Sequence, residues 1–66
     1  MEKTLNVHGM HCKSCELLLN DVISEIPGVE KVSADSKKGI VKVLYKDENT
    51  LNQIKNAIEK EGYKVS

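Results

Sequence analysis

The only two cysteines, Cys12 and Cys15, lie three positions apart, and this spacing limits how a chain of 66 residues can hold itself together. A disulfide across so short a loop would restrain very little of the unfolded chain. Domains of this size bury only about 60% of their unfolded surface and are close to the lower limit of independent folding. We therefore expect one domain over residues 1–66, stabilised by packed apolar side chains, with little room for an enclosed catalytic cavity.

The charge and hydropathy of the chain argue against two classes of partner. Ten acidic and ten basic residues give a formal net charge of zero, so the chain lacks the long-range positive field that draws proteins to nucleic acid. No segment approaches the roughly 20 consecutive apolar residues of a membrane-spanning helix, and the first residues carry no signal-peptide pattern. We expect no nucleic-acid binding, no membrane insertion of this chain, and a cytoplasmic location, where free thiols stay reduced.

Two periodicities of apolar residues alternate along the sequence. Apolar side chains at every second position predict strands over residues 5–7 and 41–45. Val29, Val32 and Ala34 predict a further strand over residues 29–34, and residues 63–65 leave room for a short closing strand. Helical spacing predicts helices over residues 15–26 and 51–61. The first helix is expected to stop at Pro27-Gly28, and the second to be capped by Thr50 and Gln53, which have the spacing of a capping box.

The predicted order of elements is βαββαβ, which favours an α+β fold of the ferredoxin-like kind. In this sandwich two helices cover one face of a four-stranded antiparallel sheet through right-handed crossovers. The other face of the sheet is exposed to water. Ile40 and Leu44 are predicted on that open face, either as isolated apolar residues or as part of a contact surface.

The cysteines fall in the segment from Gly9 to Cys15, between the first predicted strand and the first predicted helix. A helix N-terminus carries a partial positive charge and unpaired N–H groups, which favour the thiolate over the thiol. Thiolates are the ligands that soft metal ions prefer, and a C-x-x-C loop can turn both sulfurs onto one ion. The loop is therefore a predicted site for a soft metal ion, with Cu(I) favoured because an ion with few ligands is readily passed to other thiolates.

Other readings of the cysteine pair stay open at this point. A structural zinc site would need more ligands and would have to recruit His8 and His11, although His8 is predicted to point away from the core face of its strand. A carrier of Zn(II), Hg(II) or another soft ion could use the same loop. A thiol–disulfide redox couple of the thioredoxin kind also places C-x-x-C after a strand at the start of a helix, but in a larger fold.

The sequence Gly-Met-x-Cys-x-x-Cys in the first loop of a βαββαβ chain of this length resembles the heavy-metal-associated domain family. The similarity extends over nearly the whole chain. The further matching positions are Leu5, Val7, Pro27-Gly28-Val29, Gly39 and Glu61-Gly62-Tyr63. The resemblance implies a carrier without enzymatic activity, either a small copper chaperone or an N-terminal module of a copper-transporting P-type ATPase.

The resemblance also implies roles for particular residues. Cys12 and Cys15 become the metal ligands, Met10 supports the loop from the core, and Tyr63 lies near the metal loop. Methionine could instead be a third soft ligand, and the tyrosine could serve only in packing. The implied partner is a metal-transporting P-type ATPase or another C-x-x-C domain. We expect a monomer without metal, with a metal-bridged dimer as the alternative when metal is bound.

His11 departs from the commoner family pattern, in which a small or hydroxyl residue often stands between Met and Cys. An imidazole at this position could supply a third ligand and widen the metal preference toward Zn(II). The alternative is an exposed loop histidine without a role in binding.

Overall fold

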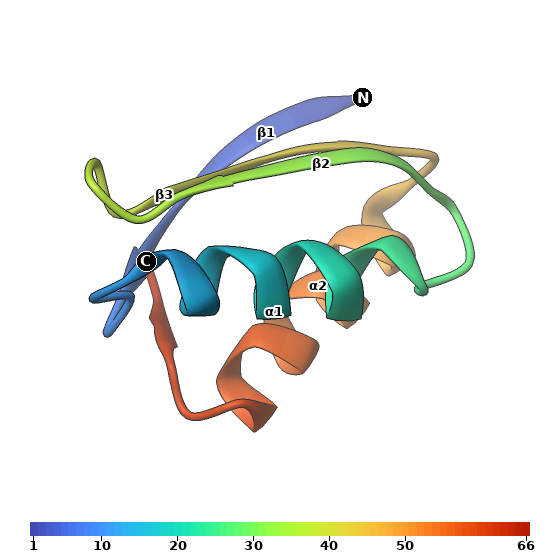
Figure 1. The fold of residues 1–66 in the computed structure, drawn as a ribbon. Coiled ribbons are helices and arrows are strands. Elements are labelled where there is room, and N and C mark those ends of the chain that lie inside the picture. The colour runs from blue at the N-terminus through green and yellow to red at the C-terminus, as the bar shows by residue number, and fades with distance from the viewer.

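The computed structural model describes every residue from Met1 to Ser66. Its elements follow in the order β1 (Glu2–His8), α1 (Lys13–Ser24), β2 (Val29–Asp35), β3 (Ile40–Tyr45), α2 (Glu48–Lys60) and β4 (Lys64–Val65). Figure 1 shows the two helices side by side against one face of the sheet, with the other face open. The predicted βαββαβ sandwich is confirmed.

The sheet has the strand order β2-β3-β1-β4, and each neighbouring pair is antiparallel. Leu5 lies opposite Val41, and Val7 lies opposite Val65, so the apolar positions of three strands share one face. Ile40 and Leu44 lie opposite Asn6 and Glu2 on the other face, as the alternation predicts.

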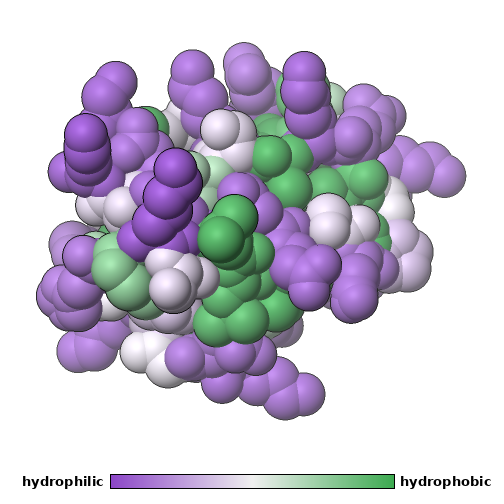
Figure 2. Space-filling model, in the orientation of Figure 1, coloured by the Kyte–Doolittle hydropathy of each residue, from purple (hydrophilic) through white to green (hydrophobic).

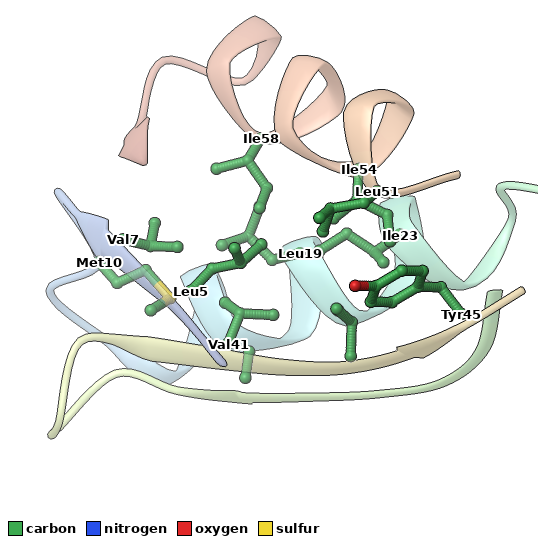
Figure 3. Close-up of a cluster of buried hydrophobic side chains, with 12 residues drawn as sticks. Leu5, Val7, Met10, Leu19, Ile23, Val41, Tyr45, Leu51, Ile54 and Ile58 are labelled. Carbon is green, nitrogen blue, oxygen red and sulfur yellow. The ribbon is translucent and has the colours of Figure 1, made fainter. Parts of the chain in front are cut away.

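The core is the layer between this sheet and the two helices (Figure 3). Helix α1 contributes Leu19 and Ile23, which have no exposed surface, and α2 contributes Ile54 and Ile58, which are equally buried. The complete cluster consists of Leu5, Val7, Met10, Leu19, Ile23, Ala34, Val41, Val43, Tyr45, Leu51, Ile54 and Ile58. Burial of this apolar layer is the main source of stability in a chain whose cysteines are free.

Both helices begin earlier than the sequence indicates. Helix α1 begins at Lys13 because Cys12 takes an extended conformation and acts as its N-cap residue. Helix α2 begins at Glu48, and its cap is Asp47, whose Oδ1 accepts hydrogen bonds from the backbone N–H and the hydroxyl of Thr50, both at 3.0 Å. The prediction that Thr50 caps this helix was wrong, since Thr50 lies inside the first turn.

Candidate metal site

The cysteine loop joins the end of β1 to the start of α1 at one end of the sandwich. Gly9 turns the chain with a φ of 109°, a left-handed conformation that side chains rarely adopt. A Cβ built on Gly9 would lie 3.1 Å from Cδ1 of Tyr63, so the loop and this ring pack closely. Met10 then points inward and is 6% exposed, next to Leu5 and Val7 in the core (Figure 3).

Cys12 and Cys15 meet at the first turn of α1. The N–H of Cys15 donates to the carbonyl of Cys12 at 3.1 Å, which closes the turn. The two sulfur atoms lie 3.8 Å apart. Cys12 is exposed, Cys15 is half-buried, and no side chain caps the helix N-terminus that carries them. The unpaired N–H groups of this turn favour negative charge on the sulfurs.

Hydrogen bonds favour the thiolate form of Cys15 in particular. They lower the pKa of this thiol from 9.0 to about 7, mainly through the side-chain hydrogen bond from Tyr63 and then through the backbone N–H of His11, against a smaller opposing effect of burial. The same bond, with burial, raises the pKa of Tyr63 to about 12, because loss of the phenolic proton would break it. At neutral pH a substantial fraction of Cys15 is therefore thiolate, with a protonated phenol beside it.

The other residues that the sequence suggested as ligands are not gathered around the sulfurs. The structure contains no group of three or more His, Cys, Asp and Glu side chains placed to share one metal ion. His11 is exposed. His8 is exposed as well, and its Nε2 lies 3.2 Å from Oγ of Ser66. The sulfur pair therefore stands alone as a ligand group, with one side open to solvent.

The distance between the two sulfur atoms suits a metal ion bound with a bent S–metal–S angle. It is somewhat shorter than the distance that a linear S–metal–S arrangement requires. With metal–sulfur bonds of about 2.3 Å, sulfurs 3.8 Å apart give an S–metal–S angle of about 110°. A linear two-coordinate ion needs sulfurs about 4.6 Å apart at the same bond length. Since the Cys12 side chain is exposed, its rotation can supply this difference without disturbing the core.

Two features near the loop escaped the sequence analysis. Leu17 and Leu18 are 62% and 41% exposed, and Figure 2 shows apolar side chains gathered on the face that α1 presents. The run from Leu17 to Leu19 could have revealed this, because three successive helical positions cannot all face one core. The second feature is Glu16, which accepts hydrogen bonds from Ser36, a contact that no local pattern indicates.

Fold and site together define a class: a small ferredoxin-like domain that presents a reduced C-x-x-C pair at a loop end. Residues 4–64 match the model of the heavy-metal-associated domain family, and the chain belongs to that family. Neither helix has the length and apolar character required to cross a membrane.

Individual relatives agree with this assignment. The copper chaperone CopZ of Staphylococcus aureus (strain JH9) is 35% identical over 65 residues, which is 97% of this chain and 96% of the relative. A solved structure of a CopZ metallochaperone superimposes with a TM-score of 0.90 at 34% identity and covers 100% of both chains. The yeast copper transporter domain CCC2A, solved in apo and Cu(I) states, has a TM-score of 0.89 at 32% identity, with 98% of this chain and 90% of that chain covered.

Proposed function

We propose that this protein carries Cu(I), held between the thiolates of Cys12 and Cys15, and passes it to a C-x-x-C site on another protein. The observation that carries the proposal is the isolated pair of sulfurs 3.8 Å apart at an exposed loop, with no further His, Cys, Asp or Glu gathered to it. Zn(II) in a structural site takes four protein ligands, which two sulfurs alone do not supply, whereas Cu(I) is one of the soft ions that thiolates bind. The copper chaperones among the relatives support the same choice.

The two thiolates play unequal parts in transfer. Cys12 is exposed and free to exchange, whereas Cys15 is half-buried and has its pKa lowered, chiefly by Tyr63. A thiolate of the partner attacks the ion, a new copper–sulfur bond forms, and the bond to Cys12 breaks. The bond to Cys15 breaks after a second partner thiolate has bound. Copper stays Cu(I) throughout, so the exchange needs no oxidant or reductant. Met10 anchors the loop in the core during this exchange.

The partner in this proposal is a metal-transporting P-type ATPase or another domain with a C-x-x-C loop. Transfer requires both loops to approach one ion, so the partner must cover the surface around Cys12. Leu17 and Leu18 lie on α1 beside the loop and give this surface an exposed apolar component. We propose that residues 1–66 form one domain, which is a monomer when no metal is bound. In this proposal it acts as a carrier without catalysis, in the cytoplasm, where the thiols stay reduced.

The experiment that tests this function follows copper between two proteins. Reduced protein loaded with one equivalent of Cu(I) is mixed with a metal-free heavy-metal-associated domain from a P-type ATPase, and copper in each is measured after rapid separation by ion exchange. We expect copper to distribute between the two proteins within minutes, and from either direction. A matched mixture with a partner whose two cysteines are serines should retain all copper on this protein. Failure to reach the same distribution from both directions would contradict the proposal.

A further inference from the structure

The loop that carries the cysteines is held at both ends by one turn of the chain. The turn joins β2 to β3 over residues 36–39, and it lies at the same end of the molecule as the loop (Figures 1 and 3). On one side of the loop, the N–H of Val7 donates to the carbonyl of Gly39 at 2.8 Å. On the other side, Ser36 donates to Oε2 of Glu16 with its backbone N–H, at 3.2 Å, and with its hydroxyl.

The turn has the rigidity that an anchor requires. Oδ1 of Asp35 accepts from the backbone N–H groups of Lys37 and Lys38, at 3.0 and 3.2 Å. Such side-chain to backbone bonds organise a turn without outside support. Gly39 lies against β1, since a Cβ built there would be in ordinary van der Waals contact, at 3.4 Å, with the carbonyl oxygen of Val7. The turn is thus tied to the central part of the sheet independently of α1.

Glu16 is the link between this anchor and the metal ligands. It follows Cys15 directly in the first turn of α1, where no side-chain cap fixes the helix N-terminus. Its carboxylate is directed to Ser36, in a part of the chain distant in sequence. We propose that Glu16 is a positioning residue of the metal site, which fixes the first turn of α1 against the β2–β3 turn and so holds the Cys15 sulfur in place relative to Cys12. The metal part of this inference rests on the proposed function.

Asn20 offers a control that distinguishes positioning of the cysteines from a general contribution to stability. It lies one turn further along α1, and its Oδ1 accepts from the backbone N–H of Ala34 at 3.0 Å. Asn20 and Glu16 therefore both accept from a backbone N–H of the β2–β3 hairpin, and Glu16 accepts from the Ser36 hydroxyl in addition. Only Glu16 lies next to a cysteine. A purely structural role predicts similar consequences for the loss of either bond.

Charge is the other property of Glu16 that could act on the cysteines. A Gln at this position removes the negative charge but keeps an amide oxygen that can accept both bonds from Ser36. The variant Glu16→Gln therefore separates the hydrogen bonds from the charge. If positioning is the role, the glutamine variant should behave like the original protein, and Glu16→Ala should not.

The test compares Glu16→Ala, Glu16→Gln and Asn20→Ala in two measurements. Backbone order parameters from NMR relaxation of the metal-free proteins report the loop directly. We expect those of residues 10–15 to fall toward the flexible range, below about 0.6, in Glu16→Ala alone. The Cu(I) dissociation constant from chelator competition should rise about tenfold or more in Glu16→Ala, the effect typical of residues that orient metal ligands, and stay within about threefold in the other two.

Three results would overturn the proposal: an unchanged loop in Glu16→Ala, equal loop disorder in Asn20→Ala, or a glutamine variant as impaired as the alanine variant. Thermal unfolding of all three proteins verifies that each is folded under the conditions used. The NMR measurement needs no metal. Failure of the original protein to bind Cu(I) would thus contradict the proposed function, while the order parameters still decide whether Glu16 positions the loop.

Discussion

The phenol of Tyr63 lowers the pKa of the Cys15 thiol, so a residue near the end of the chain acts on the cysteine loop near its beginning. The connection exists because Tyr63 lies between the end of α2 and β4, and β4 pairs with β1 just before the loop. The phenol thus sits beside the half-buried cysteine of the pair. This contact ties the chemistry of the site to the packing of the last strand.

Replacement of Tyr63 by Phe should raise the pKa of Cys15 above its value of about 7, toward 9.0, since the largest stabilising bond to the thiolate is lost. The fraction of thiolate at pH 7 then falls, and with it the apparent affinity for a soft metal ion, which requires the deprotonated ligand. The pH dependence of alkylation in a Cys12→Ser background isolates Cys15 and gives its titration midpoint. The same midpoint with Tyr63 and with Phe at this position would show that the tyrosine serves in packing only.

Replacement of His11 by Ala should change the Cu(I) dissociation constant by less than about tenfold, or about 1.4 kcal/mol. The reason is that His11 is exposed and is not gathered with the sulfurs into a group of three ligands. Competition with chelators for Cu(I) and for Zn(II) measures both affinities in parallel. A much larger loss of Cu(I) affinity would indicate that His11 is a third ligand of the copper ion. A loss confined to zinc would instead favour a carrier of divalent ions, with the imidazole completing a more tetrahedral set.

Asp47 should stabilise the fold in a pH-dependent way through its cap of α2. The hydrogen bonds from the N–H and hydroxyl of Thr50 lower the pKa of this carboxyl below its usual value of 3.8. The folded pKa is the lower one, so the charged cap contributes fully above the unfolded value and its contribution is lost as pH falls through the folded value. Asp47→Ala should lower the melting temperature by about 4–8 °C at pH 7.

Measurement of melting temperature against pH, with Asp47→Asn as the control, checks this expectation. The amide oxygen of Asn can accept the same hydrogen bonds without titrating. The melting temperature of this variant should therefore not fall at acidic pH through loss of the cap. The difference between the original protein and Asp47→Ala should shrink below the usual carboxylate range. If the difference in melting temperature stays constant down to the lowest pH at which the protein folds, ionisation of Asp47 does not contribute to stability.

Much of the fold was predictable because each element carries its own local pattern. Alternation of apolar residues identified β1 and β3, and Pro27-Gly28 marked the end of the first helical segment. The cap of α2 was misplaced because Asp47 and Thr50 are both good capping residues, and their spacing alone does not show which one takes the extended conformation. The start of α1 was placed too late for a different reason: its cap residue is Cys12, and a cysteine is not a usual cap signal.

The site was predictable only in part. The spacing of Cys12 and Cys15 marks the proposed ligands, whereas the bond between Glu16 and Ser36 depends on how α1 packs on the β2–β3 hairpin. No sequence pattern of a single chain encodes such a tertiary contact. The position of Tyr63 followed from the resemblance to a family and not from periodicity. Tertiary packing therefore sets the electrostatics of a candidate site whose proposed ligands are visible in the sequence.

The most direct test of the account is the stoichiometry and affinity of Cu(I) binding in four proteins: the original, Cys12→Ser, Cys15→Ser and Tyr63→Phe. Competition with a chromogenic Cu(I) chelator under strictly reducing, oxygen-free conditions gives both quantities. We expect one Cu(I) per chain in the original protein and loss of tight binding in each serine variant, because a single thiolate cannot chelate the ion. The tyrosine variant should keep the stoichiometry of one. Affinity equal to that of the original protein in both serine variants would contradict the assignment of the metal site.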